Sequence, residues 1–136
     1  MSEIKGKIKQ LAVSKQGSKR LQTYFSTLHN SPELVSQILE EIHSDLTFMM
    51  MDNYSNYSLK SLFQVCSQPQ RQSIINKIAP EIHKISKNKK GTHCLQNLVS
   101  LIDSDEEEQR IIEDIENHLL VISKVTLTPA FIFIFL

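Results

Sequence analysis

Three short polar segments of the chain repeat one spacing of hydrogen-bonding side chains. In each segment a polar residue follows a small one, and a long amide or amine stands four positions after that polar residue. The pairs are Ser18 with Gln22, Asn56 with Lys60, and Thr92 with Gln96. Positions i and i+4 lie on one face of a helix, so each pair can converge on a single partner. A Gln amide offers that partner both a donor and an acceptor, whereas the Lys60 ammonium offers donors only.

The three segments recur at nearly constant intervals. Gly17, Ser55 and Gly91, the small residues in front of the polar ones, stand 38 and 36 residues apart. Self-similarity at this period is typical of stacked repeats, in which no unit buries its apolar face alone. The predicted units span 4–45, 46–80, 81–118 and, in part, 119–124, and an apolar tail follows over 125–136.

Helices are the elements expected to position these residues, because Gly and Pro are few and apolar residues recur at helical spacing. Each unit is predicted to contain a short helix, a middle helix that begins at the small residue, and an amphipathic third helix. The short helices are predicted over 8–13, 46–51 and 82–86, and the amphipathic ones over 31–42, 67–80 and 104–118. Ser31 and Pro32 are typical of a helix start, and Ser104 with Glu107 has the spacing of a capping box.

Charge is segregated along the chain although 15 Lys and Arg balance 15 Asp and Glu. The regions of the predicted middle helices, 15–28, 52–66 and 86–102, contain Asp52 as their single acid. Their basic residues are Lys15, Lys19, Arg20, Lys60, Lys87, Lys89 and Lys90. The third helices are acidic, with eight acids against one arginine over 103–118. Stacked units would therefore present one basic and one acidic surface, and the basic one coincides with the polar pairs.

Other kinds of site are disfavoured by the residues present. His83 and His93 lack a third ligand at metal spacing, and no nucleophile, phosphate-loop or paired-carboxylate motif occurs, so we expect no enzyme, metal, cofactor or small-molecule substrate. Cys66 and Cys94 are expected to be buried free thiols in a reducing compartment. The apolar run over 131–136 is far shorter than the ~20 residues that span a bilayer, so no membrane association is expected.

Units of this length, with a middle helix that reads Gly, polar residue, stacking residue, two further residues and Gln, resemble the Pumilio-type (PUF) RNA-binding repeat. Residues 6–22 are similar to the first repeat of that family, 50–57 to the second, and 78–96 with the acidic run 103–108 to the third. The second unit departs from the pattern, because Ser55 stands where the family usually has Gly and Lys60 stands where it has Gln.

The resemblance implies an all-α fold, a right-handed α-α superhelix (armadillo-like solenoid) of three-helix repeats, here truncated. It implies sequence-selective binding of single-stranded RNA in mRNA 3′ untranslated regions and post-transcriptional regulation of translation or stability. It also implies a cytoplasmic location, with the nucleus or nucleolus as alternatives, and an outer face that is free for protein co-regulators.

The resemblance further implies that each repeat reads one base. The base-edge residues would be Ser18, Gln22, Asn56, Lys60, Thr92 and Gln96, and the stacking residues would be Lys19, Tyr57 and His93. Weaker phosphate contacts are expected from Lys15, Arg20, Lys87, Lys89 and Lys90. By the family's pattern the first and third units favour adenine and the second favours uracil, with the RNA antiparallel to the repeats, which gives 5′-A-U-A-3′. Since an ammonium only donates, Lys60 is expected to weaken or alter base choice in the second unit and to contact a phosphate instead.

Two further interpretations of the sequence remain open. A helical-repeat scaffold that binds a protein is favoured by the departure at Lys60 and by the small number of units. The other is a truncated or misread product of a PUF gene without independent function. The tail over 125–136 favours it, because this tail contains no polar pair with a stacking residue.

Overall fold

The computed structural model describes residues 3–101 and Glu113, and the regular elements of this part of the chain are helices, with no strand among them. The longer helices are α2 (Lys15–Phe25), α3 (Pro32–Ile42), α5 (Ser55–Val65), α6 (Gln68–Ile78) and α8 (Lys89–Ser100). The shorter ones are α1 (Ile8–Ala12), α4 (Leu46–Met51), α7 (Ile82–Ser86) and the 3₁₀ turns His43–Asp45 and Ala79–Glu81. The all-α prediction is confirmed for these residues.

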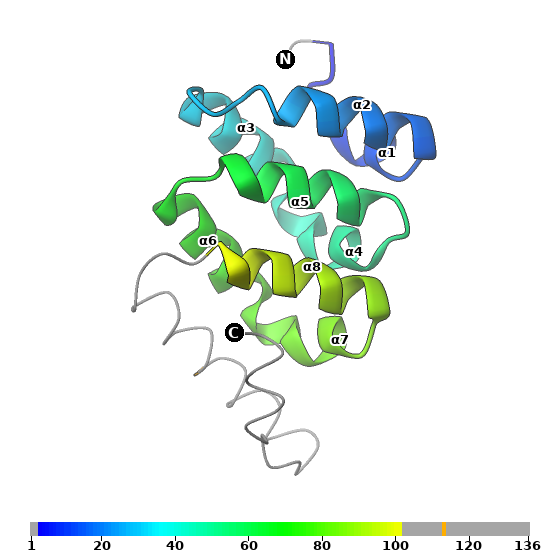
Figure 1. Ribbon diagram of the computed structural model, residues 1–136, viewed down its shortest axis with the longest axis vertical. Coiled ribbons are helices and arrows are strands. Elements are labelled where there is room, and N and C mark those ends of the chain that lie inside the picture. Colours follow the sequence, from blue (N-terminus) through cyan, green and yellow to red (C-terminus); the bar gives the residue numbers. More distant parts are fainter. Residues whose placement is uncertain (1–2, 102–112, 114–136) are drawn as a thin grey trace.

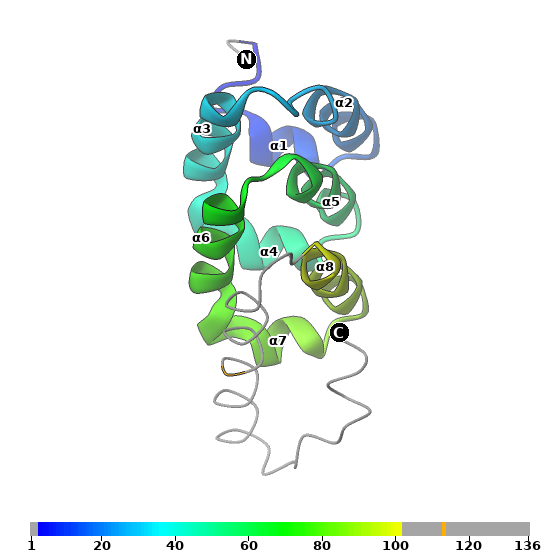
Figure 2. The same ribbon diagram turned by 60° about the vertical axis from the view of Figure 1, so that its left-hand side comes forward.

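The helices stack in columns rather than around a single centre. Figure 1 shows α2, α5 and α8 side by side in one column, and α3 and α6 in a second column next to it. Figure 2 shows the short helices α1, α4 and α7 between these two columns. We call α1–α3 the first unit, α4–α6 the second, and α7 with α8 the third. The middle helix of each unit thus lies beside the middle helix of the next.

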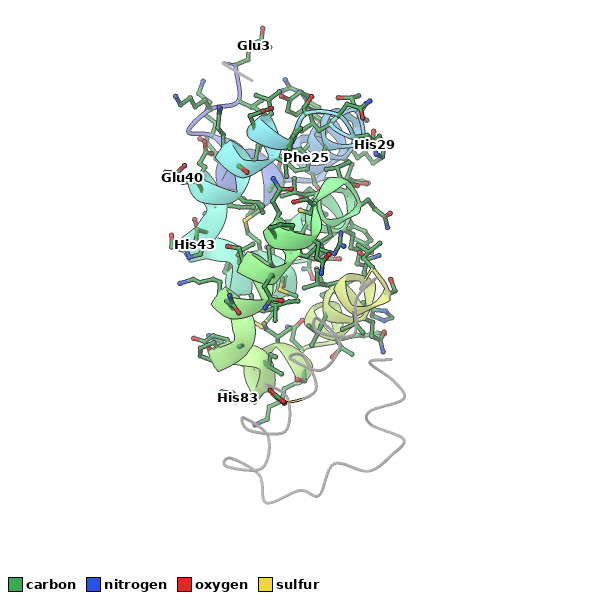
Figure 3. All side chains as sticks on the ribbon, turned by 90° about the vertical axis from the view of Figure 1, so that its left-hand side faces the viewer. Glu3, Phe25, His29, Glu40, His43 and His83 are labelled. Carbon is green, nitrogen blue, oxygen red and sulfur yellow. The ribbon has the colours of Figure 1, made fainter. Side chains whose placement is uncertain are left out.

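An apolar core runs through the stack between the columns. The predicted core residues Phe25, Leu62, Phe63 and Leu98 are fully buried, and Tyr24 and Leu101 pack partly against them. Figure 3 shows Phe25 between the column of α2 and that of α3. Burying a side chain of this size stabilises the fold by about 1.5–3 kcal/mol relative to leaving it exposed. The core therefore fixes which faces of α2, α5 and α8 remain for solvent.

The middle helices begin in two different ways. The Ser14 side chain accepts a hydrogen bond from Gly17 N at 3.0 Å, and Asn88 accepts one from Gly91 N at 2.8 Å. These side-chain caps start α2 and α8 two residues before the glycine, so the predicted start at the small residue is correct only for α5. Asp52 binds the start of α5 in a similar way, because its carboxylate accepts hydrogen bonds from Tyr54 N and Ser55 N.

The small residue of each unit lies against a carbonyl of the preceding short helix. A Cβ on Gly17 would stand 2.0 Å from Leu11 O, and one on Gly91 would stand 2.5 Å from Ile85 O. In the second unit Ser55 Oγ instead donates a hydrogen bond to Met49 O at 2.8 Å. The three acceptors occupy the same position, six residues before the small residue, which explains why the sequence repeats there.

The outer helices α3 and α6 confirm two of the predicted amphipathic helices. The second of them has a capping box, because Ser67 Oγ accepts from Gln70 N and the Gln70 side chain accepts from Ser67 N. The predicted helix over 104–118 with its Ser104 capping box, the partial unit 119–124 and the tail 125–136 lie outside the described residues. Within the described residues no helix has both the length and the apolar character needed to cross a membrane.

Candidate nucleic-acid interface

The predicted binding residues lie in a row along α2, α5 and α8. Direct contacts hold the row together: Ser18 Oγ donates to Tyr54 O at 2.7 Å, which joins α2 to the start of α5. Cys94 Sγ lies 3.9 Å from Asn56 O, which joins α8 to α5 more weakly. Successive middle helices therefore present equivalent positions next to each other, as the repeat spacing predicts.

The first pair converges as expected. Gln22 Nε2 donates a hydrogen bond to Ser18 Oγ at 3.2 Å. Ser18 itself is 2% exposed and its hydroxyl hydrogen is committed to Tyr54 O, so it faces protein rather than solvent. The half-buried Gln22 amide is the more accessible group of the pair, and Ser18 holds one end of it.

The second pair does not converge in this structure, although its spacing is the same. Asn56 is 0% exposed, and its Nδ2 donates to the carbonyls of Asp52 at 2.6 Å and Asn53 at 3.1 Å. Its side chain has folded back onto the start of α5, which is common for Asn near a helix N-terminus. The Lys60 ammonium offers no acceptor to the Asn56 amide. The Lys60 Nζ lies 4.9 Å from the centre of the Tyr57 ring instead.

The third pair is intermediate between the other two. Thr92 Oγ1 donates to Ser86 O at 2.9 Å, which fixes its rotamer and leaves the hydroxyl oxygen as an acceptor. Thr92 and Gln96 are both half-buried. Both side chains of this pair therefore remain within reach of a ligand on the solvent-facing side of α8.

The three predicted stacking residues are all exposed. Lys19, Tyr57 and His93 follow the first polar residue of each pair, and Tyr57 has 44% of its surface exposed. Because they occupy one equivalent position on neighbouring helices, they form a line of accessible side chains beside the pairs. A flat ring in such a line is a suitable surface for a base.

The basic candidates divide into two sets. Lys15, Lys87 and Lys89 are exposed, and Lys90 is half-buried against Tyr57. Arg20 is also exposed, but it lines a groove of about 470 Å³ with Ile4, Leu11 and Tyr24 at the N-terminal end of the stack. Arg20 is therefore placed apart from the contact between α2 and α5.

Acidic side chains occupy the opposite side of the described molecule. Figure 3 shows Glu40 of α3, and His43 of the 3₁₀ turn that follows α3, pointing outward on the side remote from α2, α5 and α8. Glu33 is exposed on the same helix. We call the column of α2, α5 and α8 the inner column. Asp52, the acid beside it, is bound to the N-terminus of α5, whose partial positive charge it offsets. The acidic run over 103–112 lies outside the described residues.

The two cysteines are buried free thiols, as predicted. Burial raises the pKa of Cys66 to about 12, an effect that the nearby Arg71 charge only partly opposes. Burial likewise raises the pKa of Cys94 to about 12, and the Lys60 charge partly opposes it. Both thiols are therefore neutral and unreactive near neutral pH. Between residues 3 and 101, and at Glu113, no group of three or more potential metal ligands is present.

Sequence reasoning missed the contact between units at Tyr57. Lys90 Nζ from α8 lies 5.5 Å from the centre of the Tyr57 ring and 3.5 Å from Tyr57 Oη. The available signal was positional, because Lys90 directly precedes Gly91 and so stands at the start of the helix that follows α5 in the stack. The role of Ser18 as a donor to a neighbouring unit was missed as well, since spacing alone does not show which way a short side chain points.

Comparison with known proteins places this fold in a family. A sequence model described as the Pumilio-family RNA binding repeat matches residues 48–79 and 81–116. Pumilio homolog 12 of Arabidopsis thaliana is 30% identical over 127 residues, which cover 91% of this chain and 21% of that protein. The Pumilio domain-containing protein C6G9.14 of Schizosaccharomyces pombe is 30% identical over 90 residues, 66% of this chain and 13% of that protein. The chain thus spans about a fifth or less of these relatives.

Solved structures agree with the sequence comparison. The Puf4 RNA binding domain, bound to the HO endonuclease RNA 3′ UTR recognition sequence, superposes with a TM-score of 0.74 at 28% identity, over 88% of this chain and 36% of that one. The RNA-binding domain of yeast Puf5p bound to AAT2 RNA has the same fold, with a TM-score of 0.74 at 24% identity, over 82% of this chain and 31% of that one. The predicted helical-repeat superhelix is therefore confirmed. The chain belongs to the Pumilio family of RNA-binding repeat proteins.

Proposed function

We propose that this chain binds single-stranded RNA along α2, α5 and α8, one nucleotide to each unit, with adenine preferred by the first and third units. The observation that carries the proposal is the row itself. Three neighbouring helices carry an exposed stacking side chain at equivalent positions, the first and third also present an accessible Gln amide, and lysines flank the row. A target that alternates flat bases with phosphates matches this arrangement. The RNA-bound Pumilio-family domains of the same fold support it.

The Gln residues are the proposed base readers. Ser18 Oγ accepts one Nε2 hydrogen of Gln22, which fixes the amide plane and leaves its second hydrogen and its Oε1 for a base edge. Gln96 occupies the equivalent position on α8, where the Thr92 oxygen can add an acceptor. Adenine presents a donor and an acceptor side by side, so an amide can pair with both. Ser18 acts here by positioning Gln22 rather than by touching the base.

The regulatory part of the proposal concerns the opposite face. RNA on the inner column leaves α3 and α6 accessible, where a groove of about 520 Å³ is lined by Leu39, His43 and Pro69 among others. We propose that this face is available to protein co-regulators and that the chain acts on mRNA translation or stability in the cytoplasm. A scaffold that binds protein alone is the second candidate, and the same groove favours it.

Two sets of substitutions separate base reading from charge. In the Gln22→Ala/Gln96→Ala variant we expect the preference for adenine over cytosine to fall by about tenfold per position, because each amide loses paired hydrogen bonds. In the Lys87→Ala/Lys89→Ala/Lys90→Ala variant we expect weaker binding to every RNA and a salt slope smaller by about 0.7 per lost phosphate contact. Fluorescence anisotropy at several salt concentrations measures both.

The two variants also serve as controls for each other. If the amide substitutions left base preference intact, Gln22 and Gln96 would not be readers. If the wild-type chain bound no RNA while it melted cooperatively, the RNA-binding proposal would fail and the protein scaffold would be favoured.

A further inference from the structure

Tyr57 is contacted by two lysines from two different units. Lys60 lies one turn later on α5, and its Nζ is 4.9 Å from the ring centre. Lys90 comes from the first turn of α8, with its Nζ 5.5 Å from the same ring centre and 3.5 Å from Tyr57 Oη. The ring therefore gathers two ammonium groups at the point where the second and third units meet.

Neither ammonium has an acidic partner among the described residues. The ion pair present in that part of the chain is Lys9 with Asp45, far from this cluster in the sequence. Asp52, the acid of the inner column, is already bound to the backbone of Tyr54 and Ser55. Two like charges close to one ring repel each other, and a bound anion would convert this repulsion into attraction.

The middle unit at the same time lacks an accessible base-edge reader. Asn56 is 0% exposed and bonds to the backbone of its own turn, and Lys60 is held at Tyr57. In the other two units a half-buried Gln occupies the position of Lys60. The second unit therefore offers cations and a phenol where its neighbours offer amides.

We propose that Lys60, Tyr57 and Lys90 form a phosphate-binding site between the second and third units, so that the middle nucleotide is held by its backbone and not selected by its base. The two ammonium groups and the phenol hydroxyl supply donors to the phosphate oxygens, and charged donors make the stronger hydrogen bonds. This inference rests on the proposed RNA binding, and its ligand is the phosphodiester of the RNA.

A scan of neutral linkages tests the site. RNAs of the sequence 5′-AUA-3′ in an oligouridine context would carry one methylphosphonate at successive positions and be titrated with wild type, Lys60→Met/Lys90→Gln and Lys89→Gln; Met at position 60 removes the charge without installing the Gln that reads bases in the other units. On unmodified RNA the double variant should bind about tenfold more weakly, as expected for losing charged contacts. With the neutral linkage at the middle nucleotide that loss should shrink to about twofold, because the contact is already gone. Lys89→Gln, at an exposed neighbour on the same helix that is expected to contact a different phosphate, should weaken binding by the same factor with and without the neutral linkage at the middle nucleotide.

A second measurement needs no variant. Wild-type protein should bind RNAs that differ only in the middle base with affinities within about threefold of each other, since a single base contact is worth more than this. A preference above tenfold for one middle base, or a loss in the double variant that is the same at every linkage, would overturn the phosphate site while leaving RNA binding intact. Absence of binding to any of these RNAs would instead overturn both proposals.

Discussion

The middle helix of the second unit differs from its two neighbours at both ends of the repeated motif, which runs from the small residue to the second residue of the polar pair. Where α2 and α8 have Gly17 and Gly91 pressed against a carbonyl, α5 has Ser55, whose hydroxyl donates to the equivalent carbonyl. One arrangement works by omitting a side chain, and the other works by supplying a hydrogen-bond donor. The contact between the short helix and the middle helix is thus made in two chemically different ways.

The other end of the motif differs in the same helix. Gln22 donates a hydrogen bond to Ser18 and Gln96 is a half-buried amide at the equivalent position, whereas the Lys60 ammonium lies over the Tyr57 ring. The second unit thus keeps the fold of its neighbours, and we propose that its contact with RNA is to a phosphate rather than to a base edge. Stability measurements test the first half of this comparison, and RNA binding tests the second.

The largest expected effect is at the glycine. Gly17→Ala should lower the free energy of unfolding by about 3 kcal/mol, because the new Cβ would overlap Leu11 O and force the short helix apart from α2. Urea denaturation measures the change. The control Gly6→Ala should cost only about 1 kcal/mol, since Gly6 has a positive φ of 80° but open space around it. Equal effects at the two glycines would contradict the steric explanation.

Substitution of Ser55 in the second unit should lower the free energy of unfolding less than Gly17→Ala does, and for a different reason. Ser55→Ala keeps the Cβ but removes the donor to the buried Met49 carbonyl, and we expect a loss of about 2 kcal/mol in the same measurement. Ser26→Ala is a suitable control, because its exposed hydroxyl bonds only to Thr23 O within the last turn of α2. A Ser55→Ala protein as stable as wild type would mean that the Ser55 hydroxyl does not stabilise the contact between α4 and α5.

The smallest expected effect is at the contact between the first two units. Ser18→Ala removes the hydrogen bond to Tyr54 O and should lower the free energy of unfolding by about 1 kcal/mol. It should also reduce the preference for adenine at the first unit, because Gln22 loses the group that holds its amide. An unchanged base preference with the expected loss of stability would restrict Ser18 to a structural role.

The sequence predicts much of this fold because the helical signals are local. The bounds of the short helices, the start of the amphipathic helix at Pro32, and the burial of Phe63 follow from periodicity and turn chemistry. The sequence pattern places the starts of α2 and α8 two residues too late, because Ser14 and Asn88 cap these helices ahead of the glycine.

The site is less predictable than the fold. Spacing places Asn56 and Lys60 on one face, but it does not reveal that Asn56 bonds to its own turn or that Lys60 and Lys90 meet at Tyr57. Those contacts depend on rotamers and on the distance between two units, which a single sequence does not encode in any local pattern. The roles of these residues toward RNA remain predictions that binding experiments decide.

The most direct test of the account is the affinity of the wild-type chain for two RNAs at one fixed salt concentration. One carries 5′-AUA-3′ in an oligouridine context, and the other has both adenines replaced by cytosine. If α2 and α8 read bases through Gln22 and Gln96, the first RNA should bind at least about tenfold more tightly. Equal affinities would contradict base reading by this surface.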